Sequence, residues 1–257
     1  MRLGALLTLG VVGVALILLF LGPDVRSLID TLLLALALAP PIIRQSPRAF
    51  LALARLKYWL LNTSSTWELE ARFAVVGSGM DLRSLSRSLV ANQAKGSRTL
   101  LEADDRCIFQ LTRRFTVELT RPRWEEVVPD CAAGDEELIV SISPTTVGYR
   151  DSRHFLEGEL LPLLELLRKN LQTPKELFSL TILLAGDNPF FGLYVQLVGC
   201  KAVEEFRLQF VLPAPHGDGR VTVDKEQMTV VSSTIEGLRK AASSALAFRV
   251  PAGGICR

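Results

Sequence analysis

The sequence contains little of what most catalytic and metal-binding sites are made of. Its 257 residues include two histidines and four cysteines, which stand far apart with no CxxC pair. Disulfide frameworks and zinc sites need closely spaced ligands, so neither is indicated. No GxxxxGK or strand–GxGxxG–helix pattern occurs, and neither histidine has a partner that spacing would identify. The sequence favours a binding protein over an enzyme and predicts no stably bound metal or cofactor.

Long runs of one charge sign are also missing. With 29 basic and 27 acidic residues the net charge is +2, which argues against a nucleic-acid groove and against an acidic tail. Hydrophobic residues are abundant instead: they make up 49% of the chain, and the mean hydropathy is +0.29. Most of this excess lies in the first 61 residues. The sequence therefore predicts a membrane-associated N-terminal part and a separate soluble part.

Two apolar segments predict a transmembrane helical hairpin over residues 1–45. Residues 4–21 contain no charged side chain, and a helix of that length spans about 27 Å, close to the thickness of the hydrocarbon core. Gly22-Pro23-Asp24 then breaks the helix, and a second apolar segment follows over residues 28–43. The alternatives are a cleaved signal peptide and a single anchor followed by a buried helix.

The charges that flank these segments orient the predicted hairpin. Basic residues precede the first segment and crowd after the second, whereas the intervening loop holds only Arg26. By the positive-inside rule, both ends and the soluble domain face the cytoplasmic or stromal side of an integral membrane protein. Asp30, near the start of the second segment, is interpreted as an interfacial charge. The basic residues behind this topology are Arg2, Arg44, Arg48, Arg55 and Lys57.

Residues 46–65 predict an amphipathic interfacial helix and a linker. Ser46 is a suitable N-cap and Pro47 a suitable first helical residue. The helix that follows is basic and carries Tyr58 and Trp59 near its end, a composition typical of helices in the lipid headgroup layer. The alternative is a core helix of the soluble domain.

Residues 66–257 predict a mixed, mainly antiparallel α+β domain with its helices on one face of the sheet. The order of elements suggests two duplicated halves, residues 66–172 and 173–250. Pro162 predicts a kink or a staggered start in the long helix that contains it. Alternation predicts strands over 67–76, 106–110, 115–119, 137–143, 146–149, 178–185, 192–198, 205–212, 220–223 and 228–231, and helical spacing predicts helices over 81–93, 154–171 and 233–248.

Two stretches resemble a known family. Residues 26–40 are similar to the second membrane helix of a photosynthetic assembly-factor family, and residues 58–66 (YWLLNTSST) to the helix end and strand entry that follow it. The family is the cofactor assembly of complex C factors, in particular the paired subunits of B2 and B4 type. No functional residue of the family maps onto a numbered position here.

The resemblance implies a membrane-anchored, non-enzymatic scaffold or chaperone in a cyanobacterial or thylakoid membrane. Such a factor helps to attach haem covalently to cytochrome b of the photosynthetic cytochrome bf complex. The implied partners are membrane lipid, a paralogous assembly subunit in a heterodimer, and apocytochrome b, with haem bound only transiently. No nucleic-acid partner is implied.

A second hypothesis is a membrane-anchored ligand-sensing effector whose soluble domain binds a small molecule. It requires a pocket in which basic residues such as Arg113, Arg114 or Arg121 meet a phosphate. A third, a membrane-tethered hydrolase, is the least favoured because no nucleophile–base pair can be named.

Overall fold

The computed structural model describes residues 46–76, 81–91, 97–111, 115–122, 135–171, 173, 175–198, 205–211 and 219–248. The chain divides into two units, Met1–Phe50 and Leu51–Arg257. Helix α3 (Pro47–Leu61) begins in the last residues of the first unit, and the second unit holds the sheet and the described helices that follow α3. The hairpin predicted over residues 1–45 lies outside the described residues.

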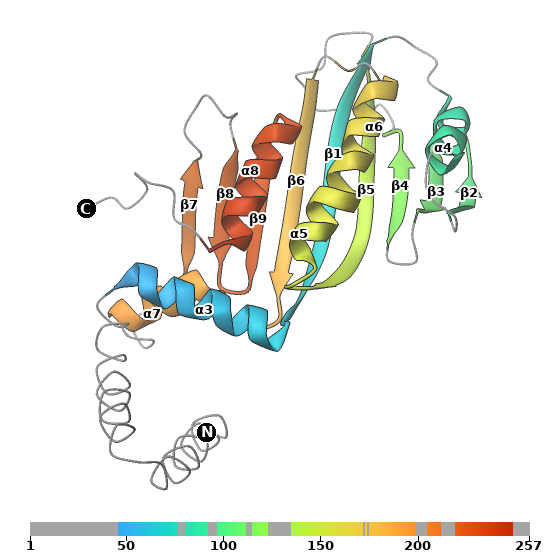
Figure 1. Cartoon of the computed structure of the whole chain (residues 1–257). Coiled ribbons are helices and arrows are strands. Elements are labelled where there is room, and N and C mark those ends of the chain that lie inside the picture. The colour runs from blue at the N-terminus through green and yellow to red at the C-terminus, as the bar shows by residue number, and fades with distance from the viewer. Residues whose placement is uncertain are drawn as a thin grey trace, which may run out of the picture. The chain divides into compact units, whose positions relative to one another are not determined.

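Nine strands form one sheet in which all neighbouring strands run antiparallel. Their order is β2-β3-β4-β5-β1-β6-β9-β8-β7 (Figure 1). Helices α6 (Leu161–Leu171) and α8 (Ile235–Leu246) lie side by side over one face, and α4 (Leu82–Ala91) packs against β2 and β3. The strands are β1 (Ser64–Val76), β2 (Arg98–Glu102), β3 (Arg106–Gln110), β4 (Thr116–Thr120), β5 (Asp135–Gly148), β6 (Lys175–Leu184), β7 (Arg207–Val211), β8 (Arg220–Asp224) and β9 (Gln227–Ser232).

The central strand β1 shows how the sequence builds this layer. Every second side chain is buried, and most of the side chains between them are polar and only half-buried, the alternation expected of a sheet with one covered face. Aromatic rings meet edge to face in the core: Trp67 contacts Phe155 at 5.4 Å between ring centres, and Phe73 contacts Phe178 at 5.8 Å. The buried side chains of β1 are Ser65, Trp67, Leu69, Ala71, Phe73 and Val75.

β5 is one long strand where the sequence predicts two. Its pairing with β1 shifts by one residue, so that Ser143 and Pro144 together lie opposite the single residue Glu68. This is a β-bulge, one of the few places where a sheet tolerates proline, because the extra residue needs no ladder hydrogen bond. The Ser143 hydroxyl donates instead to the Thr116 carbonyl at 2.9 Å.

The helix predicted over residues 154–171 begins with a short α-helical turn, α5 (Ser152–His154), followed by the π-helical segment Phe155–Leu160 and then α6. Pro162 lacks the N–H that would otherwise bond to the carbonyl of Gly158 in an α-helix. The irregularity that the sequence predicts near Pro162 therefore takes the form of a wider turn directly before α6.

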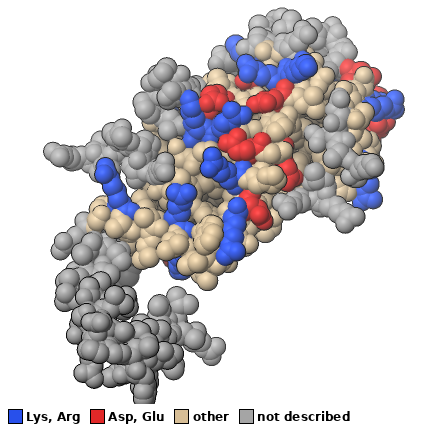
Figure 2. Space-filling view, viewed as in Figure 1, with Lys and Arg blue, Asp and Glu red and all other residues tan. Residues whose placement is uncertain are grey.

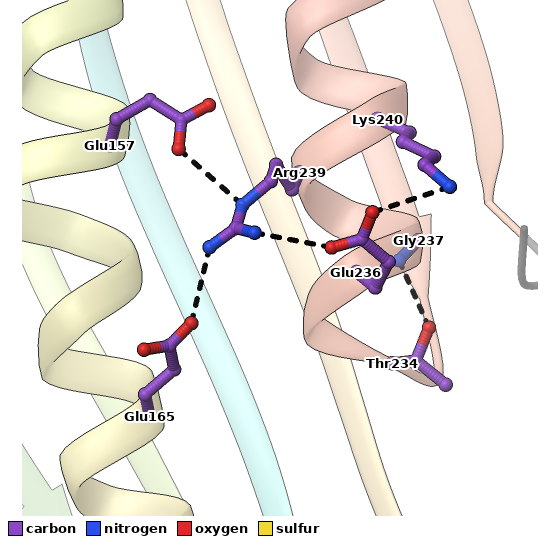
Figure 3. A network of polar contacts seen from close by, with 7 residues as sticks. All are labelled: Glu157, Glu165, Thr234, Glu236, Gly237, Arg239 and Lys240. Carbon is purple, nitrogen blue, oxygen red and sulfur yellow. Dashed lines mark hydrogen bonds and ion pairs between the residues drawn. The ribbon is translucent and has the colours of Figure 1, made fainter.

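Charged side chains cover the outside of this helical layer. Arg239 of α8 reaches Glu165 of α6 at 3.1 Å and Glu157 of the π-helical segment at 3.4 Å (Figure 3). Glu236 pairs with Arg239 at 3.2 Å and with Lys240 at 3.3 Å. Exposed ion pairs of this kind contribute at most about 1 kcal/mol each to the free energy of unfolding. Because Arg239 links α8 to two glutamates of the neighbouring helix, the network helps to set how α6 and α8 pack together.

The order of elements repeats along the chain. β1-α4-β2-β3-β4-β5-α6 is followed by β6-α7-β7-β8-β9-α8, where α7 is Pro189–Val198. The two series run outward in opposite directions from the β1–β6 pair at the centre of the sheet, so β3 corresponds to β7, β4 to β8 and β5 to β9. Among the strands that the structure describes, only the first series contains one that corresponds to β2.

The predicted fold class is wrong. The predicted fold is a transmembrane helical hairpin followed by a mixed, mainly antiparallel α+β domain, whereas the described residues form one continuous nine-stranded antiparallel sheet with few helices. Within the part of the chain that the structure describes, no helix has the length and apolar character needed to cross a membrane. Residues 192–198, predicted as a strand, belong to helix α7, and strand β2 was not predicted.

Candidate functional site

Helix α3 (Pro47–Leu61) begins where the sequence predicts it. Pro47 occupies the first helical position, where a backbone N–H would have no partner within the helix. The Ser46 hydroxyl accepts a hydrogen bond from the Ala49 amide at 3.3 Å, and the Ser46 carbonyl accepts one from the Phe50 amide at 3.0 Å. Ser46 is therefore the N-cap of α3.

The other end of α3 closes in a Schellman turn. Asn62 has a φ of 46°, the left-handed conformation typical of the residue after a helix. Its amide donates to the Trp59 carbonyl at 3.3 Å, and the Thr63 amide donates to the Tyr58 carbonyl at 3.1 Å. Two carbonyls that the helix would otherwise leave without a partner are thereby satisfied.

Arg150, two residues after β5, holds the same helix end from outside. Its Nε donates to the Trp59 carbonyl at 2.7 Å and its Nη2 to the Leu60 carbonyl at 2.9 Å. The guanidinium also lies over the Trp59 ring, 4.8 Å from its centre. A cation at a helix C-terminus complements the helix dipole, and a cation over an indole ring is attracted to it.

One face of α3 is anchored to the domain. Leu51 and Tyr58 are buried. The Tyr58 ring meets Tyr149 at 5.7 Å and Phe248 at 5.2 Å between ring centres, and its hydroxyl donates to the Asp187 carbonyl at 3.2 Å. Burial raises the pKa of both tyrosine hydroxyls above the ordinary value, so both stay neutral at physiological pH. This aromatic cluster fixes α3 at one end of the sheet.

The opposite face of α3 is apolar as well. Leu53, Leu56 and Leu60 recur at helical spacing and point away from the anchored face, with 48%, 49% and 57% of their surface exposed. Trp59 and Leu61 are exposed beside them. A helix at a protein surface normally turns a polar face to water, so an outward stripe of leucines indicates a binding surface.

The charges on α3 are all of one sign. Its sequence contains no acidic residue, and its three basic residues, Arg48, Arg55 and Lys57, are exposed. Figure 2 shows basic side chains among uncharged residues over α3, whereas most acidic side chains gather over the layer of α6 and α8. We refer to the exposed residues of α3 from Leu53 to Leu61 as the α3 surface.

Helix α7 adds apolar side chains at the same end of the domain. It contains no charged residue. Phe190 is buried and contacts Phe248 at 6.1 Å, which joins α7 to the aromatic cluster that anchors α3. Tyr194 is exposed and packs on Phe206 at 5.5 Å. The apolar character of this end therefore extends beyond α3.

The structure brings part of the predicted site together. Arg48, Arg55, Lys57 and Trp59 are exposed on α3 as predicted for an interfacial helix, whereas Arg2, Asp30 and Arg44 lie outside the described residues. Tyr58 is buried and faces the domain, so its predicted place among the membrane-facing residues is wrong. The residues that sequence reasoning missed are Leu53, Leu56, Leu60 and Arg150. The leucine spacing was visible in the sequence, but which of the two apolar stripes is buried was not.

The other candidates from the sequence contribute little to this site. In the described ranges, no group of three or more His, Cys, Asp and Glu side chains is placed to hold a metal ion. Cys107 is buried, and its thiol donates to the Ala103 carbonyl at 3.5 Å. Arg113 and Arg114 lie outside the described residues, and Arg121 follows β4 directly.

We expect Arg150→Ala to loosen the end of α3 without unfolding the domain. Two hydrogen bonds from an exposed guanidinium and its contact with Trp59 together contribute about 1–2 kcal/mol. Hydrogen exchange of the Asn62 and Thr63 amides should accelerate by about tenfold, since a factor of ten corresponds to about 1.4 kcal/mol. The matched control is Arg153→Ala, an exposed arginine three residues further on. Equal exchange rates in both variants would contradict the role of Arg150.

Comparison with known proteins adds nothing to the geometry of this site. The chain matches no protein-family model and no curated protein. The resemblance of residues 26–40 and 58–66 to assembly factors therefore stays a prediction.

Proposed function

We propose that the α3 surface docks on an anionic membrane and that the protein serves there as a non-enzymatic assembly factor. The observation that carries this proposal is the outward stripe of Leu53, Leu56 and Leu60 on a helix whose other face is already anchored. A solvated surface helix gains nothing from such a stripe. A bilayer surface offers both the acyl chains for the leucines and the phosphates for the flanking cations.

The magnitudes suit peripheral docking. Full burial of one leucine side chain contributes about 1.5–3 kcal/mol, and each basic residue near anionic headgroups about 1 kcal/mol. The leucines are only about half exposed, so each has about half of that gain left to make. Arg55 and Lys57 add the electrostatic part, and Trp59 suits the headgroup level. These contributions suffice to hold α3 flat in the headgroup layer.

The assembly role rests on the resemblance and on the binding character of the chain. We propose that the protein works at the cytoplasmic or stromal surface of a photosynthetic membrane. There it would hold apocytochrome b, together with a paralogous assembly subunit, while haem is attached covalently. Haem would be bound only transiently, and the protein itself would not catalyse the formation of the covalent bond. The absence of acidic residues on α3 is consistent with a position against anionic lipid.

The docking is tested with tryptophan fluorescence of the full-length protein. The chain has three tryptophans, of which Trp67 is buried in the core and Trp59 is exposed on α3. In anionic vesicles whose lipids carry bromine at shallow acyl positions, we expect part of the emission to be quenched. Trp59→Phe should abolish most of this quenching. Equal quenching of wild type and Trp59→Phe would refute docking by the α3 surface.

The assembly role requires a separate test. Affinity purification of the protein from its native membrane should recover cytochrome b and a related assembly subunit. Deletion of the gene should leave that cytochrome without its extra covalent haem. Recovery of neither partner would refute the assembly role and leave the docking of α3 unaffected, because docking is measured with lipid alone.

A further inference from the structure

Within the described ranges, one strand of the first series has no counterpart in the second. In the first series β2 covers the outer edge of β3. In the second series β7 corresponds to β3, and among the described residues no strand pairs with the outer edge of β7. By analogy with β3, whose outer edge pairs with β2, a further strand can pair with the outer edge of β7.

The connections that precede β3 and β7 also differ in length. Residues 92–105 connect α4 to β3 and include β2 and its turn, whereas residues 199–206 connect α7 to β7. β2 and its turn alone occupy residues 98–105, as many residues as the entire second connection. The second connection, with 8 residues against 14, is therefore six residues shorter than the first.

The two edges of the sheet also differ in how they are protected. β2 contains a bulge at Leu100, where its register with β3 shifts, and it carries a charge at each end, in Arg98 and Glu102. Bulges and charges on an edge strand discourage pairing with other chains. β7 has neither a bulge nor a charge in its centre: its five residues pair with β8 in regular register, and Val211 is 57% exposed.

We propose that the outer edge of β7 pairs with β7 of a second copy of this chain. The two strands would run antiparallel about a twofold axis at Gln209, which joins the two sheets into one. In this register Leu208 lies opposite Phe210 of the partner, on the helix-covered face. Arg207 lies opposite Val211 of the partner, on the open face.

The side chains of β7 are complementary to themselves in this register. On the helix-covered face an apolar residue meets an apolar residue, which is the favourable cross-strand pairing. On the open face no like charges meet, because Arg207 lies across from a valine and is neutralised by Asp224 of its own chain at 3.1 Å. Phe206, directly before β7, and the exposed Tyr194 extend the apolar surface beside this edge. Pairing with a second copy therefore satisfies the backbone hydrogen-bonding groups on the outer edge of β7 and buries no unpaired charge.

Light scattering coupled to size exclusion tests the proposal on the full-length protein. Mild non-ionic detergent is needed because residues 4–21 contain no charge. We expect a dimer for the wild type and monomers for Gln209→Lys and for Gln209→Glu, since each places two like charges on the axis. Mixing the two variants should restore the dimer, because unlike charges then meet. Gln209 is exposed, so circular dichroism should show both variants folded.

A disulfide across the axis supplies the geometric test. Under oxidation Gln209→Cys should form a covalent dimer in which position 209 is linked to position 209 of the partner, as mass spectrometry of the joined peptide would show. The control is Thr99→Cys on the opposite edge strand, which should give no more dimer than the wild type. A monomeric wild type would overturn the proposal, and so would a dimer that survives Gln209→Lys and forms no crosslink in the Gln209→Cys variant. The docking of α3 on lipid would be untouched by either result.

Discussion

Trp67→Ala should lower the free energy of unfolding by about 3–5 kcal/mol, the range for removing a large aromatic side chain from a core. Trp67 lies on the central strand β1, only 2% exposed, with its ring against Phe155 of the π-helical segment. The cavity would open between the sheet and its helical layer, where neighbouring backbone cannot collapse freely. Urea unfolding followed by circular dichroism measures the change, and the slope of the transition should stay the same.

Two further substitutions separate the ring from its hydrogen bond. Trp67 Nε1 donates to the Ser65 hydroxyl at 2.8 Å, and that hydroxyl donates to the Val147 carbonyl at 3.2 Å. Trp67→Phe keeps most of the volume and should cost about 1–2 kcal/mol. Thr66→Ala, on the open face of the same strand, should stay within about 0.5 kcal/mol of the wild type. Similar losses in all three variants would contradict the assignment of Trp67 to the core.

Replacing Leu56 and Leu60 together by glutamate should detach α3 from anionic vesicles. The two half-exposed leucines together contribute about 1.5–3 kcal/mol when they enter the acyl boundary. Each new carboxylate adds about 1 kcal/mol of repulsion from anionic headgroups. The sum of about 3.5–5 kcal/mol corresponds to a roughly thousandfold shift of the docking equilibrium. Quenching of Trp59 by brominated lipid should therefore fall to background.

The chain provides a matched control for this pair. Leu100 and Leu101 on edge strand β2 are 51% and 42% exposed, close to the 49% and 57% of Leu56 and Leu60. Replacing both of them by glutamate makes the same change in composition and net charge at another place. Quenching of Trp59 should be unaffected. If both double variants lost the quenching equally, its cause would be overall charge and not the α3 surface.

Most strands could be predicted because one covered face enforces alternation. β3 was predicted with its observed bounds, and β8 and β9 to within a residue at their ends, since every second side chain is buried in each. β2 escaped prediction because all but one of its residues are exposed and no pattern marks them. β5 was divided at Pro144 because a bulge that accommodates a proline depends on its partner strand, which a single segment does not reveal.

Helix α7 was mistaken for a strand although the sequence marks its start. Asn188 precedes Pro189, an N-cap followed by a suitable first residue, and the Asn188 side chain accepts a hydrogen bond from the Phe190 amide at 3.0 Å. The residues that follow are apolar on all sides, so no helical periodicity stands out against a buried strand. The capping residues Asn188 and Pro189 were better evidence for a helix than the hydrophobic pattern was for a strand.

The candidate site could be predicted only in part, for a related reason. The exposed cations of α3 follow from its amphipathic sequence. The burial of Tyr58 depends on Phe248, 190 residues later in the chain. The end of α3 is capped by Arg150, which lies on a turn beyond β5. Such distant contacts decide which apolar stripe of α3 is turned inward, and no local pattern contains that information.

The central pair of strands also governs how the chain reaches its native state. β1 is synthesised early, yet along one edge it pairs with β6, where Phe73 lies opposite Glu176, 103 positions later. Contacts so distant in sequence must overcome a large loop-closure entropy, which makes folding slow. Until β6 has emerged from the ribosome, β1 presents an unpaired edge in the middle of the future sheet. Completion of the sheet therefore has to wait for the second half of the chain.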